Sequence, residues 1–140
     1  MKPIPKTEQA LVLRTDFSNQ AAWEEICAEL QKPAGPMNFY AYVHFLDDAE
    51  FADLTKDQLL QRIPQDYNHS FIMVVDRAAI AQPEHPLQVI ELFWRPGKEF
   101  RAIPSAIQEI ENNLSIANMD FEEFAGAVED DGVFRGFPYE

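Results

Sequence analysis

Five consecutive apolar residues, Phe71–Val75 (Phe-Ile-Met-Val-Val), constrain this chain more than any other stretch. The run leaves no polar face at the two-residue period of a strand, and its valines and isoleucine favour extended backbone. Such a strand is usually covered on both sides, in the middle of a sheet with helices packed on it. A buried helix would give a similar pattern, but the run is short and ends at Asp76. We therefore predict a central strand.

The segments around this run complete an α/β pattern. Strands are predicted at 10–15, 39–46, 71–75, 87–94 and 98–103, and helices after Ser18, Thr55, Ser105 and Asp120. The order βαβαβββαα predicts a mixed sheet of about five strands with helices on both faces, in a single domain over residues 1–140. The order is also compatible with a thioredoxin-like topology, although one cysteine cannot form a Cys-X-X-Cys redox motif.

Helix starts carry local signals of their own. We predict Ser18 as the N-cap of the first helix. The later starts have the spacing of a capping box, in which Ser, Thr or Asp is followed three residues later by Glu or Gln. These pairs are Thr55 with Gln58, Ser105 with Gln108, and Asp120 with Glu123. The strands predicted at 87–94 and 98–103 form a hairpin, in which Arg95-Pro-Gly-Lys98 predicts a type II turn.

The net charge of −13 is the strongest global property of the chain. It argues against binding to nucleic acid, which needs clustered Lys and Arg, and against binding to an anionic membrane surface. Residues 105–140 hold nine acidic side chains and one basic side chain, Arg135. Solubility alone would explain this composition, but the uneven charge also suits a cationic protein partner attracted by the field.

The compartment follows from the cysteine count and the hydropathy. The one cysteine, Cys27, falls in an apolar helical stripe with Trp23, Ile26 and Leu30, so we expect a buried, unreactive thiol and no disulfide. The N-terminus has no apolar signal-peptide region, and no apolar run approaches the ~18 residues of a membrane span. We expect a cytoplasmic protein.

Aspartates follow the first three predicted strands: Asp16, Asp47, Asp48 and Asp76. The carboxyl ends of parallel strands share one edge of a sheet, so these carboxylates could converge there and bind Mg²⁺. Aspartate is also favoured at strand ends because it accepts hydrogen bonds from turn and helix amides. Apart from this metal hypothesis the sequence predicts no cofactor, since it has no Gly-rich phosphate loop and no His-X-X-X-His pair.

Two further groups of residues are candidate binding surfaces. Tyr40, Tyr42 and His44 share one face of the second predicted strand and suit the wall of a groove, unless they pack beneath a helix. A polar corner between the last two helices contains Asn112, Asn113, Asn118 and Asp120, with Arg135 folded back from the tail. These side chains either fix the corner by binding backbone groups or form a polar recognition surface.

Several stretches resemble a family of short uncharacterised bacterial proteins. They are Leu13–Ser18, Ala22–Trp23, His69–Phe71, Val74–Asp76, Ile110–Ala125 and Asp130–Phe137. The resemblance covers nearly the whole chain and implies a bacterial origin and a stand-alone domain. It implies no activity, so no functional residue is carried over from it.

Three functions remain open at this point. The preferred one is a non-enzymatic binding module with a basic protein partner, comparable by analogy to inhibitors and immunity proteins of bacterial toxins. The alternatives are a magnesium-dependent enzyme that uses the strand-end aspartates, and a small-molecule binder that uses the Tyr40, Tyr42 and His44 face. No residue has the spacing of a catalytic motif.

Overall fold

A computed structural model describes residues 1–137 and contains one six-stranded mixed sheet of order β2-β1-β3-β4-β5-β6. Residues 138–140, which include the acidic Glu140, lie outside the described residues. The strands are β1 (Ala10–Arg14), β2 (Val43–Leu46), β3 (Phe71–Val75), β4 (Leu87–Glu91), β5 (Glu99–Ala102) and β6 (Val133–Phe134). β1 is parallel to β2 and β3, β4 is antiparallel to both of its neighbours, and β6 is parallel to β5.

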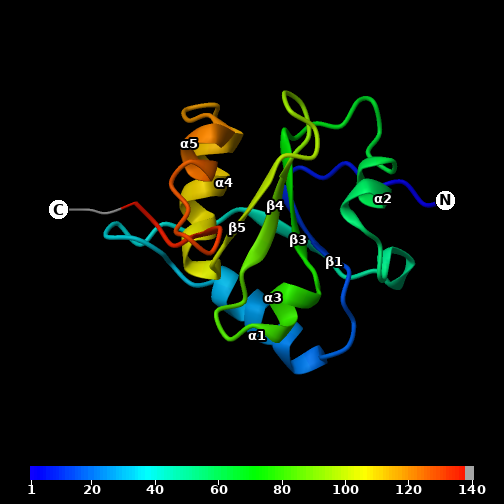
Figure 1. Ribbon diagram of the computed structural model, residues 1–140, viewed down its shortest axis with the longest axis horizontal. Helices are drawn as coiled ribbons and strands as arrows, with labels where there is room; N and C mark the ends of the chain where they lie inside the picture. Colours follow the sequence, from blue (N-terminus) through cyan, green and yellow to red (C-terminus); the bar gives the residue numbers. More distant parts are fainter. Residues whose placement is uncertain (138–140) are drawn as a thin grey trace.

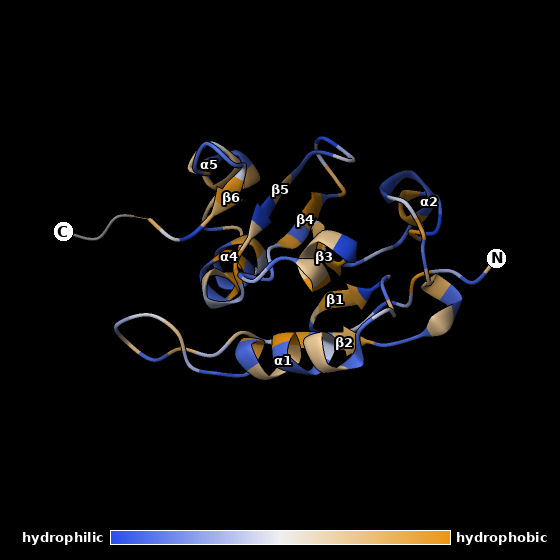
Figure 2. Ribbon diagram, turned by 60° about the horizontal axis from the view of Figure 1, so that its bottom comes forward, coloured by the Kyte–Doolittle hydropathy of each residue, from blue (hydrophilic) through white to orange (hydrophobic). Residues whose placement is uncertain are grey.

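Helices cover both faces of this sheet, as predicted. They are α1 (Gln20–Leu30), α2 (Lys56–Leu60), α3 (Arg77–Ala81), α4 (Ile107–Ser115) and α5 (Phe121–Ala125), with the short 3₁₀ turns η1 (Ala49–Phe51) and η2 (Pro104–Ala106). One face packs against α1, α3, α4 and α5, and the other against η1 and α2 (Figure 1). Figure 2 shows the hydrophobic side of α1 turned toward the strands. None of the described helices is long and apolar enough to cross a bilayer.

The central-strand prediction is confirmed. β3 lies between β1 and β4, and all five of its residues are buried. Alternate side chains enter different cores, because successive residues of a strand point to opposite faces. Phe71, Met73 and Val75 join the core under α1 and α4, while Ile72 and Val74 join the one under α2. This two-sided burial explains why the run has no polar position.

The core under α2 also contains a residue from before the first strand. Ile4 is completely buried there with Phe51 and Leu59. Its backbone N–H donates to the carbonyl of Arg62 at 2.9 Å, just beyond the end of α2. The N-terminal segment therefore helps to hold the short α2 against the sheet.

The capping predictions are confirmed at two helices and wrong at two others. Thr55 and Gln58 form the full reciprocal box, and Glu123 accepts the N–H of Asp120 at 3.2 Å. The N-cap of α1 is Asn19, whose side chain accepts the N–H of Ala22, and not Ser18. Ser105 lies inside η2, because Pro104 begins that turn three residues before Ile107, the first residue of α4.

Four strands are shorter than predicted, β1 by one residue at its end, β5 by one residue at each end, and β2 and β4 by more, and neither the helix α3 nor the strand β6 was predicted. β2 begins at Val43 and not at 39, and β4 ends at Glu91 and not at 94, which leaves an exposed Phe93 and Trp94 in the hairpin. The hairpin turn has the predicted form, with a positive φ of 92° at Gly97 and a 2.9 Å bond from the Lys98 N–H to the Arg95 carbonyl. The additional elements, α3 and β6, are too short to leave a periodic signal.

Candidate functional site

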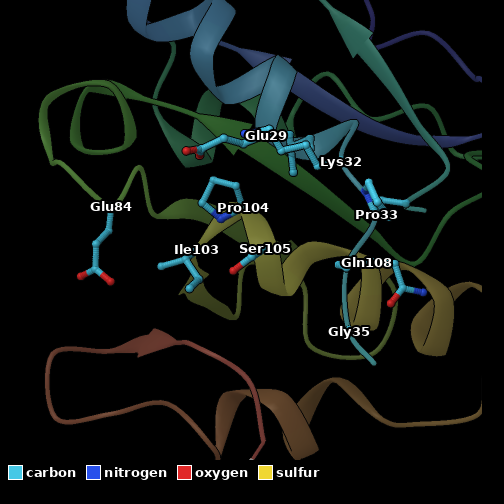
Figure 3. Close-up of a pocket in the computed structure, with 12 residues that line it drawn as sticks. Glu29, Lys32, Pro33, Gly35, Glu84, Ile103, Pro104, Ser105 and Gln108 are labelled. Atoms are coloured by element: carbon cyan, nitrogen blue, oxygen red, sulfur yellow. The ribbon is translucent and has the colours of Figure 1, made fainter. Parts of the chain in front are cut away.

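A cavity of about 620 Å³ opens where the C-terminal end of α1 meets η2 and the start of α4. Figure 3 shows the side chains of Glu29 and Glu84 at one end of this cavity, and Gly35 and Gln108 toward the other. Its apolar lining includes the buried Leu30 and Pro104. The cavity therefore combines an apolar surface with two carboxylates and one ammonium group, that of Lys32.

Local structure explains how these residues come together. α1 ends at Leu30, and the following loop turns back through an isolated bridge between Ala34 and Phe39. Glu84 lies in the loop between α3 and β4, and it is held by the guanidinium of Arg135 at 2.8 and 2.9 Å. The hydrogen bonds from Arg135 hold the pKa of Glu84 below its ordinary value, so this carboxylate is ionised at neutral pH.

The negative charge continues beyond the entrance. We define the acidic face as six carboxylates that surround Arg135 and the adjoining end of α1: Glu25, Glu29, Glu84, Glu129, Asp130 and Asp131. Arg135 binds Glu129 and Asp131 at 2.8 and 2.7 Å in addition to Glu84. One arginine thus organises three of the six carboxylates but leaves the group strongly negative.

His85 links this face to α3. Its Nδ1 lies 2.8 Å from the carbonyl of Ala79, and its Nε2 lies 3.0 Å from the carboxylate of Glu25. Burial lowers the pKa of His85, but its bonds to the Ala79 carbonyl and the Glu25 carboxylate raise it, and the net shift is upward. A protonated His85 would neutralise Glu25 and reduce the charge of the face.

The polar corner between α4 and α5 is largely bonded within itself. Asn113 donates to the carbonyl of Glu109 at 2.8 Å, and Asn118 donates to the side chain of Asn113 at 2.9 Å. Asp120 accepts two bonds from Arg95, at 3.1 and 3.2 Å. These contacts support the reading in which the amides fix the corner.

The corner residues do not share one surface with Arg135. Asn112 and Asn113 line a cavity of about 280 Å³, whereas Asn118 and Asp120 line a different one of about 460 Å³. Arg135 lines neither of these cavities and belongs to the acidic face. The structure therefore keeps Asn113 and Asn118 in contact at the corner and places Arg135 elsewhere.

The aromatic face that we expected either in a groove or under a helix is exposed. Tyr40 and Tyr42 are 54% and 64% exposed, and both precede β2 at the edge of the sheet. His44 is also exposed, within β2. Of the three, only Tyr42 lines a described cavity, which it shares with His69 and Glu111. The expected packing of this face beneath a helix is therefore wrong.

The strand-end aspartates bind protein groups and do not gather into one site. Asp16 accepts the N–H of Ser18 at 3.0 Å, and Asp47 lies 3.3 Å from the buried guanidinium of Arg14. Asp48 caps η1 and pairs with Lys2. Asp76 caps α3 and pairs with Arg101.

These contacts correct the magnesium hypothesis. Within residues 1–137 no group of three or more His, Cys, Asp or Glu side chains is placed to hold a metal ion. The physical reason is that each strand-end carboxylate is oriented by its own cap or basic neighbour. Aspartate was favoured at these positions for local hydrogen bonding.

Cys27 packs as expected in the apolar side of α1. Its side chain is partly buried against the larger core, and burial raises the pKa of its thiol to about 11. A thiol with so high a pKa holds little thiolate near neutral pH and is a weak nucleophile.

The residues around the 620 Å³ cavity were missed by reading the sequence. The residues next to Glu29 and Glu84 in the sequence do not distinguish them from ordinary surface carboxylates. In addition, 51 positions separate Glu84 from its partner Arg135. The one available signal was the lone arginine in an acidic segment, which predicted an ion pair but not its partner.

A family model described as a domain of unknown function (DUF6924) matches residues 9–137. The curated proteins contain no match to the chain.

Proposed function

The chain belongs to the DUF6924 family of domains of unknown function, and we propose that it is a non-enzymatic binding module whose acidic face receives a basic segment of a partner protein. The observation that carries the proposal is the cavity of about 620 Å³, whose lining has the carboxylates of Glu29 and Glu84 against one cation, Lys32, and which adjoins the rest of the acidic face. A lysine or arginine side chain has an apolar stem and a cationic head, and it matches an apolar cavity with carboxylates at its edge.

The charge of the whole chain supports the same partner. A net charge of −13 attracts basic proteins over distances of about a Debye length, roughly 8 Å at physiological salt. Exposed ion pairs contribute little individually, so the affinity of such a complex depends on several carboxylates acting together. Binding should therefore be fast and sensitive to salt.

Small acidic inhibitors and immunity proteins act on basic partners in a similar way, and the comparison is one of analogy. In that role the acidic face would cover a basic surface that the partner needs for its own activity. The exposed position of the face, along the end of α1 and the 129–131 turn, supports access by a macromolecule.

The test uses a fluorescent octa-arginine peptide and two variants of equal charge. Glu29→Gln with Glu84→Gln removes both carboxylates at the cavity, and Arg135 keeps Glu129 and Asp131 as partners. Glu50→Gln with Asp57→Asn makes the same change in net charge at exposed positions in η1 and α2, on the other face of the sheet. Peptide binding is followed by fluorescence anisotropy at low and at physiological salt.

We expect the cavity variant to bind the peptide at least about fivefold more weakly than the wild type, and the matched control to bind within about twofold of it. Equal losses of affinity in the two variants would mean that peptide binding depends only on the net charge, and they would contradict the proposed site. Absence of binding by the wild-type protein at low salt would count equally against it.

A further inference from the structure

A second site lies apart from the acidic face and includes none of its carboxylates. Two cavities of about 460 and 450 Å³ share Asn68, His69 and Ser115 in their linings, so they are neighbours, and we consider the two together as one groove. We call it the Glu111 groove. It runs between the β4–β5 hairpin and the α4–α5 junction, which lie together at the top of Figure 1, whereas α1 and α3 lie at the bottom.

A buried carboxylate lines one end of this groove. Glu111 is only 5% exposed, and among the described residues it has no lysine or arginine partner. It accepts two long hydrogen bonds, from the Tyr42 N–H at 3.4 Å and from the Ser115 hydroxyl at 3.3 Å. A buried charge is stable only with a close partner, so an ionised Glu111 is better satisfied by a cation in the groove.

Several other polar groups of the groove can accept hydrogen bonds. Asn68 and Asn118 each donate an amide N–H, to the Thr7 carbonyl and the Asn113 side chain at 2.8 and 2.9 Å, and their carbonyl oxygens can accept a hydrogen bond from a ligand. His69 Nε2 lies 2.8 Å from the Thr7 carbonyl, so in the neutral ring Nε2 carries the proton and Nδ1 is an acceptor. A ligand with N–H donors can therefore bind these acceptors as well as the Glu111 carboxylate.

The other end of the groove is aromatic. Phe93 and Trp94 line it, and they are 48% and 77% exposed in the hairpin. Large apolar side chains exposed next to a cavity commonly mark a ligand site, and the faces of aromatic rings attract organic cations. The acidic Glu8 adds a further negative charge at the Glu111 end.

We propose that the Glu111 groove binds a free linear polyamine, with one protonated amine at Glu111 and the methylene chain and a second amine along Trp94 and Phe93. A polyamine has only N–H donors and apolar methylenes, which match the acceptors and the rings. An anionic ligand such as a nucleotide would meet Glu8 and Glu111 without a lysine or arginine in the lining of either cavity.

The protonation state of Glu111 agrees with this assignment. Burial raises the pKa of Glu111, although the Tyr42 N–H, the Ser115 hydroxyl and the charge of His69 oppose the shift. An arriving ammonium ion would favour the ionised form and release a proton from any fraction of the protein in which Glu111 is protonated.

The test is calorimetric titration of the full chain with spermidine at low salt. Wild type is compared with Glu111→Gln, with Trp94→Ala, and with the charge-matched control Glu50→Gln in η1, away from the groove. We expect Glu111→Gln, which removes the buried carboxylate, to weaken spermidine binding more than about tenfold. Trp94→Ala, which removes the indole, should weaken it about threefold. Glu50→Gln should stay within about twofold of the wild type.

The proposal fails if spermidine gives no saturable binding, or if Glu50→Gln weakens binding as much as Glu111→Gln. Mg²⁺ is titrated separately. Displacement of spermidine by an equal concentration of Mg²⁺ would mean that spermidine binds only through diffuse charge attraction, and it would overturn the proposal. A blocked tri-lysine peptide that binds more tightly than spermidine would overturn the assignment to a free polyamine. Thermal unfolding of each variant establishes that it is folded. The acidic face is the same in the wild type and in all three variants, so a difference between Glu111→Gln and Glu50→Gln reports on the groove alone.

Discussion

The carboxylate of Asp76 accepts two hydrogen bonds from the guanidinium of Arg101, at 2.9 and 2.6 Å. The same carboxylate accepts the N–H of Ala79 and so begins α3. One side chain therefore connects the end of β3 to β5, across the intervening β4. Both partners are less than a third exposed, so solvent screens this pair less than an ion pair at the surface.

Loss of this connection should destabilise the protein. We expect Asp76→Ala to lower the free energy of unfolding by about 2–3 kcal/mol, because it removes both the cap and the ion pair. Asp76→Asn retains a cap oxygen and should cost about half as much. Urea unfolding of both variants, and of each combined with Arg101→Met, gives the coupling energy of the pair; a coupling near zero would contradict this prediction.

Glu111 should make the stability of the protein fall with rising pH. Its pKa is raised by burial, so the unfolded chain releases this proton at a lower pH than the folded chain, and stability falls as pH rises above the ordinary value of 4.5. Glu111→Gln should therefore be more stable than the wild type near neutral pH, by about 1.4 kcal/mol for each unit of pKa shift. The difference should vanish at low pH, and urea unfolding from acid to neutral pH tests it.

The contact of His85 with Glu25 predicts a second loss of stability with rising pH, at a higher pH than that of Glu111. The folded pKa of His85 is raised above its ordinary value of 6.5, so its contribution to stability is fully present below 6.5 and is lost as pH rises through the folded pKa. An NMR titration of the His85 ring should give a pKa above 6.5 in the wild type and a lower one in Glu25→Gln. Glu24→Gln, at the neighbouring exposed position of α1, should leave the pKa unchanged; an equal drop in both variants would refute a specific pair.

The aromatic cluster around β6 should be essential for stability. Phe134 is completely buried, and its ring centroid lies 5.3 Å from that of Phe124 and 5.0 Å from that of Phe137. We expect Phe134→Ala to cost about 3–5 kcal/mol in the free energy of unfolding, because it leaves a cavity in the core. Ile116→Ala, at a position that is 64% exposed, should change the same quantity by less than about 0.5 kcal/mol.

The sequence predicted those parts of the fold that have a strong local pattern. The central β3, the Thr55 capping box and the turn at Gly97 could all be recognised from neighbouring residues. The ends of strands could not, because the length of an edge strand depends on its pairing partner. β2 illustrates this: residues 39–42 alternate like a strand but lie beyond the register in which Ala10 pairs with Val43.

The sites were harder to predict, because each combines residues from distant parts of the chain. Glu84 and Arg135 meet only through the tertiary fold. Glu111 did carry a local signal, since it occupies the i+4 position of the stripe formed by Ile107, Ile110 and Leu114, where an apolar residue is normal. A carboxylate in such a stripe indicates a buried charge, which must have a partner or a function.

The burial of Ile4 shows that the folded unit is longer than the region by which its family is identified. The match to that family begins at residue 9, yet Ile4 closes the core beneath α2 and bonds to the carbonyl of Arg62. A version of the protein that began at residue 9 would open a hydrophobic hole beside Phe51 and Leu59. Expression, deletion and domain-fusion designs should therefore take their N-terminal limit from packing and not from sequence similarity.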